Sequence, residues 1–381
     1  MPLIRFLTMC LLSLSACAVS AAAAVTFDLL DPPGEDRVID GALSDDGATL
    51  AVVSDGRYHR WTREGGFEDL GAGHALATAV GISGDGGTVC GAVSADDGAR
   101  KPAVRDRDGR WTSLAGVSGS GGDKAGAAFD ANADGSVVVG LAWDGERPAA
   151  FRWTPGGGAE LLPDSGAGAR ATAVNGRGTV AAGFDVDPRT GSRRPARWVA
   201  GRLDLLAGPD HVGEVTDVDA TGRRYCGQVD DRAFYRDDEL GLVILGALDS
   251  GSGDRSRAMA LTAGGVVVGW SGDPAWGSPE AFVWSRDAGM RRMSEWLAAL
   301  GTPLPGGLEL VNVLDASSDG STMVGLWRDE AWNEGLWLVA GLDATAYEAL
   351  ARMGEAMQPW QGDLPPLGSP PSRPGRPVRF R

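Results

Sequence analysis

The stretch NADGSVVVG, residues 132–140, decides the fold because it recurs along the chain. It consists of a polar residue, a short turn ending in glycine, and an apolar run ending in a second glycine. Successive copies lie about 45 residues apart, a period typical of proteins built from repeated small sheets. The seven copies are SDDGATLAV (44–52), SGDGGTVCG (83–91), NADGSVVVG (132–140), NGRGTVAAG (175–183), DATGRRYCG (219–227), TAGGVVVG (262–269) and SSDGSTMVG (317–325).

Each copy contains three further segments with the apolar content of short strands. One precedes the turn, as in ATAVGIS (77–83), and another follows the apolar run, as in AFRW (150–153) and AFVW (281–284). A fourth, such as GAELLPD (158–164), completes most copies. Four short strands repeated at this period form the blade of a β-propeller. We therefore predict an all-β fold, a seven-bladed β-propeller of four-stranded blades.

The two ends of the repeat region predict how the ring closes. The last copy lacks a fourth strand, and VTFDLLD (25–31), ahead of the first copy, matches the fourth-strand pattern. We expect it to complete the seventh blade, so that the propeller occupies 25–340 and has no open edge. Helical spacing appears at 290–300, an insertion in the sixth copy, and again at 341–358, where Asp343 is the expected N-cap. The Pro-rich tail 359–381 is expected to be disordered.

The repeats resemble the HAF-repeat family of exported bacterial proteins, named for a segment that here reads AAFRW and EAFVW. The resemblance covers essentially 25–340 and implies an exported, propeller-shaped protein of undefined activity. Ala150, Ala233 and Glu280 or Ala281 stand where the family has histidine, and no catalytic residue is carried over. A weaker resemblance, of SGDGGTV and SSDGSTM to the Asp-box of sialidase-type propellers, lacks the Thr-Trp ending.

The start of the chain resembles a secretory signal peptide over residues 1–24. Arg5 precedes an apolar core, and a run of alanines offers a cleavage site. Leu14-Ser15-Ala16-Cys17 also resembles a lipobox, so lipidation of Cys17 is an alternative to ordinary cleavage. We expect an exported protein, in the periplasm, on the outer membrane as a lipoprotein, or outside the cell. The apolar core is too short to span a bilayer, and no second such segment follows, so no transmembrane segment is expected.

Charge and composition limit the partners. The formal charge is −16 and Lys101 and Lys124 are the only lysines, which argues against nucleic acid because phosphates require clustered cations. Hydrophobic residues make up 43% of the chain, so a folded core is expected despite 58 glycines. We expect a monomer whose partner is an extracytoplasmic glycan or peptide.

The opening stretch also raises the question of calcium. Asp130, Asn132, Asp134 and Gly135 spell the start of a calcium-binding loop, but Leu141 stands where the bidentate Glu is needed. The alternative is a turn whose opening residue accepts a hydrogen bond from a backbone N–H two residues on, with its glycine at positive φ. We favour the turn. The chain has three histidines and no zinc motif or nucleophile elbow, so we expect no metal, no cofactor and no enzyme.

Two groups of residues are candidates for ligand binding. The strand nearest the channel carries one residue per copy two positions before the turn, and in three copies it is an aspartate: Asp130, Asp217 and Asp315. These acids either hold a cationic ligand or cap backbone amides. The second group is Trp270, Trp276, Trp327 and Trp332, which suit either sugar or peptide binding or packing. Five other tryptophans recur at one repeat position and predict packing between blades: Trp61, Trp153, Trp198, Trp284 and Trp337.

The sequence therefore predicts a binding or interaction module of undefined ligand. The alternative is a glycan-directed hydrolase or lyase that uses channel acids such as Asp130 and Asp217. Beyond the leader, Cys90 and Cys226 occupy equivalent positions in the second and fifth copies. Equivalent positions three blades apart are too distant for a disulfide, so both thiols are expected to be free and buried.

Overall fold

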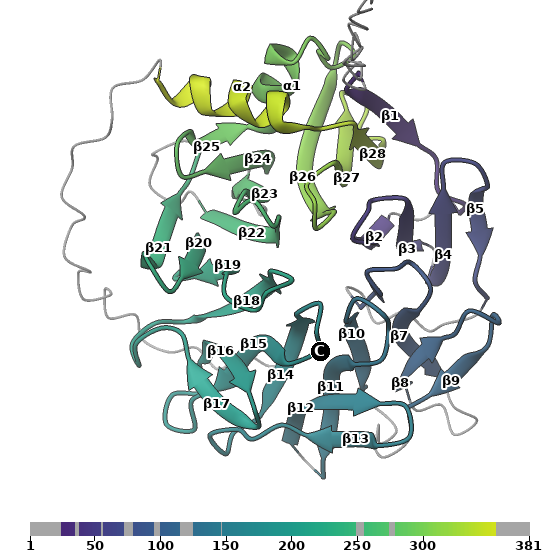
Figure 1. The fold of residues 1–381 in the computed structure, drawn as a ribbon, viewed down its shortest axis with the longest axis vertical. Helices are drawn as coiled ribbons and strands as arrows, with labels where there is room; N and C mark the ends of the chain where they lie inside the picture. The colour runs from purple at the N-terminus through teal and green to yellow at the C-terminus, as the bar shows by residue number, and fades with distance from the viewer. Residues whose placement is uncertain are drawn as a thin grey trace, which may run out of the picture.

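The computed structural model describes residues 24–34, 38–54, 56–71, 79–94, 100–114, 125–145, 147–248, 255–273 and 279–355. These residues form seven antiparallel four-stranded sheets arranged radially around a common centre, as Figure 1 shows. The predicted seven-bladed β-propeller is confirmed. Residues 1–23 of the expected signal peptide, with Cys17, and the whole of the expected disordered tail 359–381 lie outside the described residues.

In blades 1 to 6 the strands follow one another outward from the channel in chain order. Blade 1 contains β2 (Val38–Leu43), β3 (Thr49–Ser54), β4 (Arg57–Thr62) and β5 (Gly66–Asp69). Blade 2 contains β6 (Gly81–Ile82), β7 (Val89–Ser94), β8 (Arg100–Arg105) and β9 (Trp111–Ser113). Blade 3 contains β10 (Ala127–Ala131), β11 (Val138–Asp144), β12 (Arg147–Thr154) and β13 (Gly158–Leu161).

The remaining blades repeat this order, except that the last takes its outer strand from the other end of the chain. Blade 4 contains β14 (Ala169–Val174), β15 (Val180–Val186), β16 (Arg193–Val199) and β17 (Arg202–Leu205). Blade 5 contains β18 (Gly213–Val218), β19 (Tyr225–Val229), β20 (Arg232–Asp237) and β21 (Gly241–Gly246). Blade 6 contains β22 (Arg255–Leu261), β23 (Val267–Gly272), β24 (Glu280–Ser285) and β25 (Gly289–Arg292). Blade 7 contains β26 (Leu308–Ala316), β27 (Thr322–Asp329), β28 (Glu334–Ala340) and β1 (Thr26–Leu30).

The ring closes as the sequence predicts. Strand β1 pairs antiparallel with β28, from Thr26 opposite Ala340 to Leu30 opposite Leu336. The two ends of the repeat region therefore meet in one sheet, and Figure 1 shows β1 beside blade 7. Because β1 covers the outer edge of β28, that strand does not present unpaired backbone groups to water.

The hydrophobic core lies between neighbouring blades. Trp198 packs in one cluster with Val137 and Ala150 of the preceding blade, as the repeated tryptophan position predicts. Trp61 and Trp284 are likewise buried, and Trp153 is half-buried against a similar cluster. Trp337 is buried as well, but it does not occupy the predicted repeat position. It lies opposite Gly325, which is the place that Phe151 takes opposite Gly140, whereas the repeated position in blade 7 is held by Val339 opposite Met323.

In five of the seven copies the glycine that ends the apolar run is required by close backbone approach, whereas the first copy has Val52 at this place. A Cβ on Gly140 would overlap the carbonyl oxygen of Ala127 and lie 2.7 Å from Cε1 of Phe151. Nearby, β10 carries one extra residue, Phe129, between the pairs made by Ala128 and Asp130. The same β-bulge recurs in β14, β18, β22 and β26. A bulge re-aims the side chains that follow it, and here it precedes the residue that faces the channel.

The turns follow the predicted chemistry with one difference. Gly135 has a φ of 72°, as the turn interpretation requires. The opening residue, however, reaches across the whole turn: Asn132 Oδ1 accepts a hydrogen bond from the N–H of Val137, five residues on, at 2.8 Å. The carboxylate of Asp134 is the group that binds an N–H two residues on, that of Ser136 at 3.0 Å. The prediction assigned this bond to the wrong side chain.

Two helices pack on the outside of blades 6 and 7. Helix α1 (Met293–Ala299) is the insertion expected at 290–300, and α2 (Ala344–Glu355) is the expected C-terminal helix. Asp343 caps α2, because its Oδ1 accepts hydrogen bonds from the N–H groups of Thr345 and Ala346 at 2.9 and 3.1 Å. The indole of Trp296 in α1 donates a hydrogen bond to the carbonyl of Ala346 in α2 at 3.0 Å, which links the two helices.

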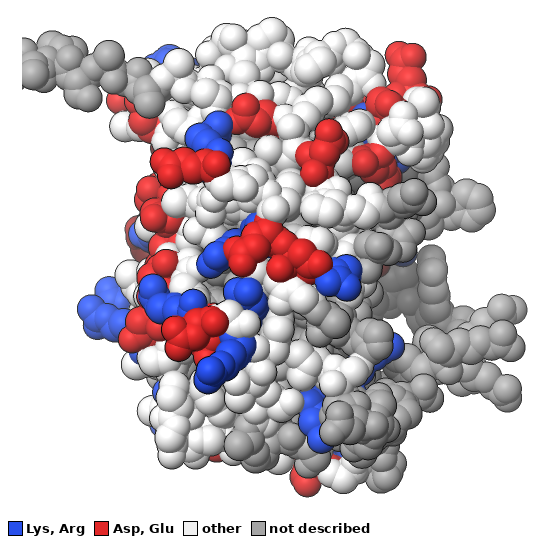
Figure 2. Space-filling view, turned by 90° about the vertical axis from the view of Figure 1, so that its right-hand side faces the viewer, with Lys and Arg blue, Asp and Glu red and all other residues white. Residues whose placement is uncertain are grey.

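The outer surface mixes charges of both signs. Figure 2 shows this on one side of the ring, where acidic and basic side chains lie next to each other among uncharged ones. On blade 1 the pairs include Arg57 with Asp69 at 2.5 Å and Arg60 with Glu68 at 2.5 Å. Such exposed pairs contribute little to stability, about 0–1 kcal/mol each. Neither helix in the described part of the chain combines the length and the apolar character that a membrane span needs.

Cys90 and Cys226 are free and fully buried. They hold equivalent positions, since Cys90 lies opposite Gly81 in blade 2 and Cys226 lies opposite Asp217 in blade 5. Burial raises the pKa of both thiols, which keeps them uncharged. Both cysteines therefore pack as small apolar residues, as the repeat register predicts.

Candidate binding site in the central channel

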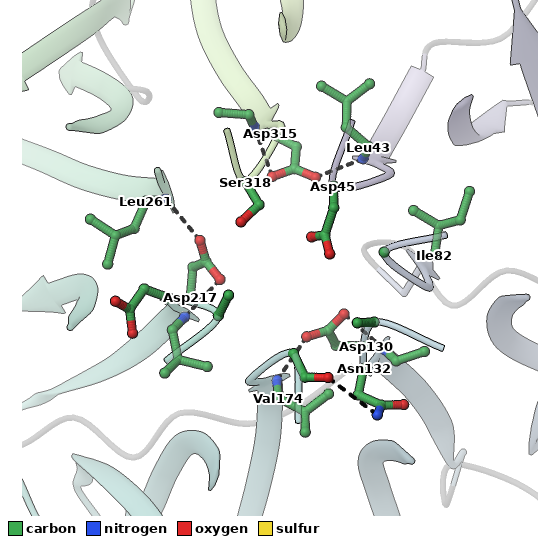
Figure 3. Close-up of a pocket in the computed structure, with 18 residues that line it drawn as sticks. Leu43, Asp45, Ile82, Asp130, Asn132, Val174, Asp217, Leu261, Asp315 and Ser318 are labelled. Carbon is green, nitrogen blue, oxygen red and sulfur yellow. Dashed lines mark hydrogen bonds between the residues drawn. The ribbon is translucent and has the colours of Figure 1, made fainter. Parts of the chain in front are cut away.

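The first strand of every blade presents one residue to the channel, two positions before the turn, which we name the channel position. It is occupied by alanine or glycine in blades 1, 2, 4 and 6 and by aspartate in blades 3, 5 and 7. Figure 3 shows the carboxyl groups of Asp130, Asp217 and Asp315 converging on the centre from three sides. The structure thus brings together the three acids that the sequence singled out.

Each of these carboxyl groups joins two blades. Asp130 accepts hydrogen bonds from the N–H of Ala131 in its own strand, at 2.8 Å, and from that of Val174 in blade 4, at 2.7 Å. Asp217 bonds Val218 and, in blade 6, Leu261, at 2.6 and 2.7 Å; Asp315 bonds Ala316 and, in blade 1, Leu43, at 2.8 and 2.7 Å. The channel aspartates therefore cap backbone amides, which is one of the two roles that the sequence left open. One of the two amides belongs to the next blade.

Burial raises the pKa of all three carboxyl groups, and the neighbouring acids raise it further. The pKa of Asp217 rises to about 8 and that of Asp315 to about 7, while that of Asp130 lies well above its usual value. Burial also raises the pKa of Asp40, in β2, to about 7. Backbone N–H bonds act in the opposite direction in each case. Asp40, Asp217 and Asp315 therefore change charge near neutral pH, unlike ordinary carboxylates.

The three aspartates lie at the boundary between two cavities of the channel. A narrow cavity of about 100 Å³ opens among the glycine turns, where Asp45, Asn132 and Ser318 also line it (Figure 3). A wider cavity of about 480 Å³, which we name the chamber, lies on the other side. Asp130, Asp217 and Asp315 border both, so they form the floor of the chamber, whereas Asp40 borders the chamber alone.

The wall of the chamber is built by residues three positions before the channel position. In blades 4, 5 and 6 these are Arg170, Glu214 and Arg257, all of which border the chamber. Arg170 Nη2 lies 2.7 Å from Glu214 Oε2, and Arg257 Nη2 bonds Glu214 Oε1. The ion pairs thus run from blade to blade around one side. The apolar part of the lining comes from Phe129, Met259, Trp270 and Leu314.

The sequence did not predict this wall, although a signal for it exists. The repeats align Arg170, Glu214 and Arg257 in one column, which becomes visible only when the first strand is read three positions further back. In an ideal strand, residues three positions apart face opposite sides. The bulge between them restores both to the channel side. A sequence does not show where a bulge occurs. Simple strand alternation therefore predicts that Arg170, Glu214 and Arg257 point away from the channel.

The tryptophan candidates lie in different surroundings. Trp270 borders the chamber, whereas Trp327 packs in the core of blade 7 and donates a hydrogen bond from Nε1 to the carbonyl of Leu336 at 3.1 Å. Trp332 is 73% exposed in the turn between β27 and β28, beneath the guanidinium of Arg328. Trp276 lies outside the described residues. Only Trp270 among the described three belongs to the channel site.

The stretch that resembles a calcium loop sends its side chains to separate places. Asp130 points into the channel, Asn132 spans its turn, and Asp134 bonds Ser136. The hydrogen bonds from Ser136 hold the pKa of Asp134 below its usual value. Within the described ranges no three His, Cys, Asp or Glu side chains are grouped as metal ligands would be.

Comparisons with known proteins support the fold alone. No family model matches the chain, and no curated protein matches it. Among solved structures, the β-propeller domain of Cps50 (Swd1) from Myceliophteria thermophila superposes with a TM-score of 0.53 at 15% identity, covering 84% of this chain and 100% of that one. The β-propeller domain of the Trilobed protease from Pyrococcus furiosus gives a TM-score of 0.52 at 13% identity, covering 81% and 98%.

TolB from Acinetobacter baumannii is a further match, with a TM-score of 0.44 at 16% identity. The match covers 54% of this chain and 53% of the TolB chain.

The propeller of the Trilobed protease has an open velcro topology. The present ring differs from it, because β1 pairs with β28 and joins the two ends of the repeat region.

Proposed function

We propose that this protein is a binding module whose ligand enters the chamber of the channel. The observation that carries the proposal is the chamber itself, about 480 Å³ in volume and bordered by charged, polar and apolar side chains together. Sites for small ligands are typically concave, of about 300–1,000 Å³, with apolar walls and a few fixed polar groups. Met259, Trp270 and Leu314 supply the apolar wall here, and Arg170 and Glu214 are among the polar groups.

The setting of this function is part of the same proposal. The leader-like residues 1–24 and the resemblance to HAF-repeat proteins support export, with an extracytoplasmic glycan or peptide as ligand. Lipidation at Cys17 would hold the module at a membrane surface, whereas cleavage after the alanine run would release it. Mass spectrometry of the exported protein distinguishes these, because only the first leaves an acylated Cys17 at the N-terminus.

A screen of glycans and peptides against the full chain, prepared by export, tests the binding function. We expect a saturable ligand whose affinity falls at least tenfold with Trp270→Ala, since Trp270 borders the chamber. Trp332→Ala is the matched control, because Trp332 is 73% exposed in a turn and is not among the chamber-lining residues. A ligand that depends on Trp332 and not on Trp270 would contradict the chamber as the site, and so would the absence of any ligand.

A glycan-directed hydrolase or lyase is the second candidate. The observation that favours it is Asp217, whose pKa burial raises to about 8, so that it stays protonated near neutral pH as a general acid must. Against it, each channel aspartate already accepts two backbone hydrogen bonds. Each ligand found in the screen should be incubated with the protein and analysed by mass spectrometry. Products that disappear with Asp217→Asn would favour the enzyme; an unchanged ligand would favour the binding module.

A further inference from the structure

Positive charge exceeds negative charge on one wall of the chamber. Three guanidiniums surround the single carboxylate of Glu214: those of Arg170, at 2.7 Å, Arg193, at 3.6 Å, and Arg257. The Glu214 side chain is only 7% exposed. Burial alone would raise its pKa, but the charges of Arg257 and Arg170 outweigh burial and hold the pKa below its usual value. One carboxylate therefore faces three guanidiniums here, in a protein whose overall charge is −16.

The guanidinium of Arg170 is held in place and keeps an unused donor. It stacks on Phe129 at 5.0 Å and on Phe184 at 4.9 Å, and Arg193 also stacks on Phe184, at 4.6 Å. Its Nη2 donates to Glu214, but its buried Nε–H has no hydrogen-bond partner among the residues that the structure describes. A guanidinium offers five N–H donors in a planar fork that matches an oxyanion. Because stacking fixes this fork in advance, binding an oxyanion loses little side-chain entropy.

The electrostatic balance of Arg170 also favours a second anion. Burial lowers the pKa of its guanidinium, Glu214 opposes this, and the charges of Arg193 and Arg257 lower the pKa further. A lowered pKa means that the surroundings do not fully compensate the positive charge. A second oxyanion beside Arg170 and Arg257 would supply the missing counter-charge.

The floor of the chamber fixes the orientation of the ligand. Asp130, Asp217 and Asp315 border it toward the narrow cavity. Asp40 lies at the level of the wall, opposite Val53 as Arg170 lies opposite Phe184, and the charge of Arg257 opposes the effect of burial on its pKa. Burial raises the pKa of all four aspartates, so near neutral pH a part of them is protonated and uncharged. Their oxygens accept hydrogen bonds and repel an anion when ionised. The end of the ligand that reaches the floor therefore carries hydroxyl or amino groups, and the oxyanion lies at the wall.

We infer that the ligand of the chamber bears an oxyanion, a carboxylate or a phosphate, held by the guanidiniums of Arg170 and Arg257. This inference rests on the proposed function, because it names the chemical class of ligand for the same chamber. An acidic sugar and a peptide with a free carboxylate both satisfy it. A neutral sugar or a ligand with cationic groups only does not.

Matched pairs of ligands test the inference directly by isothermal titration calorimetry on the full chain. Galacturonate is compared with galactose, and trialanine with its C-terminal amide, so that each pair differs chiefly in one carboxylate. Inorganic phosphate forms a third arm and tells phosphate recognition from carboxylate recognition. We expect the anionic member of at least one pair, or phosphate, to bind at least tenfold more tightly than the neutral probes. Equal affinity within both pairs, with no phosphate binding, would overturn the inference.

Variants then place the oxyanion at the wall. The double variant Arg257→Gln with Glu214→Gln keeps the net charge and leaves no carboxylate unpaired, and we expect it to lose at least tenfold in affinity for the anionic probe. Arg257→Lys keeps the charge without the planar fork and should lose part of the affinity, as should Arg193→Gln, at a side chain that is 51% exposed. Arg63→Gln, at an exposed ion pair with Asp28, is the control and should bind as the wild type does.

The outcomes separate this inference from the proposed function. If the anionic probe binds the double variant as tightly as the wild type, the wall is not the site and the inference fails. If the glycan and peptide screen yields a chamber ligand without any preference for an oxyanion, the inference fails while the binding function stands. If neither the screen nor the anionic probes show binding, both fail.

Discussion

An aspartate at the channel position makes contacts that alanine cannot make. Its Oδ1 binds the next N–H of its own strand, and its Oδ2 binds an N–H of the neighbouring blade, as Asp217 does with Val218 and Leu261. These amides border the narrow cavity of the channel. A buried N–H left without a partner costs about 1–3 kcal/mol. The aspartates therefore hold pairs of blades together at the centre of the ring, whatever else they bind.

Replacing Asp217 by alanine should lower the free energy of unfolding by roughly 1–3 kcal/mol, because the amides of Val218 and Leu261 lose their acceptor. Urea unfolding followed by circular dichroism measures the change. Asp204→Ala is the control: Asp204 pairs with Arg197 at 3.4 Å at a partly exposed site, and its loss should cost less than about 1 kcal/mol. Equal losses in the two variants would mean that the bond between blades contributes nothing measurable.

The channel acids also predict how stability depends on pH. Burial raises the pKa of Asp40 and Asp315 to about 7 and that of Asp217 to about 8 in the folded protein, against 3.8 for an ordinary aspartate. The folded state therefore holds more protons than the unfolded state between these values, and stability falls as pH rises. Their contribution is full below about pH 4 and is lost as pH rises through 7–8.

Unfolding free energies at pH 6 and pH 8.5 test this sign, and the wild type should be less stable at pH 8.5. Asp217→Asn should show a smaller difference between the two pH values, because one titrating group is gone. Asp134→Asn is the control, since the pKa of Asp134 is lowered by the Ser136 hydrogen bonds and lies far from this range. A rise in stability toward pH 8.5 would contradict the raised pKa values. Binding of the anionic ligand should weaken over the same interval, as Asp40, Asp217 and Asp315 become charged in the chamber.

At the scale of strands, β1 differs from the other outer strands because it belongs to the opposite end of the repeat region. It lies against β28 over five residue pairs, and Phe27 stacks on Trp337 with ring centroids 6.4 Å apart. In blade 4 the outer strand β17 merely continues the local chain after β16. The loss of β17 would damage one blade, whereas the loss of β1 would also open the ring.

A proline tests this difference, because it cannot donate to a strand ladder. Leu30 in β1 and Leu206, which follows β17, are equivalent, since Leu30 lies opposite Leu336 and Leu206 donates its N–H to the carbonyl of Pro195 at 2.8 Å in the same column of the repeat. Both are buried, at 8% and 5% exposure. We expect Leu30→Pro to lower the melting temperature more than Leu206→Pro. The same decrease in both, measured by differential scanning fluorimetry, would show that ring closure adds no stability.

In the whole molecule, seven blades cannot all be paired. The aspartate bonds join blades 3 and 4, 5 and 6, and 7 and 1, and the described residues of blade 2 take part in none of them. Its channel position is Gly81, where a Cβ would lie 2.5 Å from the carbonyl oxygen of Phe129. Tyr58 of blade 1 makes a different link to blade 2, because its hydroxyl donates to the Ala79 carbonyl at 3.1 Å and accepts from the Ala92 N–H at 2.8 Å.

Hydrogen exchange should reveal this asymmetry. We expect amides of β7 in blade 2 to exchange faster than those of the equivalent strand β19 in blade 5, because local opening of blade 2 breaks no aspartate bond. Asp217→Ala should raise the exchange rate of β19 and leave that of β7 unchanged. Mass spectrometry of peptides from the two strands gives both rates. Slower exchange in β7 than in β19 would contradict the prediction.

The sequence by itself determined the architecture, because the signals that encode it are local. The glycine turn, the apolar run and their spacing of about 45 residues specify each blade, and the displaced strand at 25–31 specifies the closure. The same alignment found the channel aspartates. It placed Trp337 in the wrong column, because two neighbouring inward-facing positions of the third strand accept a large side chain and only the pairing with β27 tells them apart.

Only the tertiary structure decided what the channel residues touch. The partner of Asp130 is the amide of Val174, which is 44 residues away in the chain and is brought near by the packing of adjacent blades. The wall of Arg170, Glu214 and Arg257 depends in addition on β-bulges, each of which returns a residue to the channel side by inserting one extra position. Neighbouring strands around the ring and bulges within them are set by packing between blades, and no local sequence pattern records them.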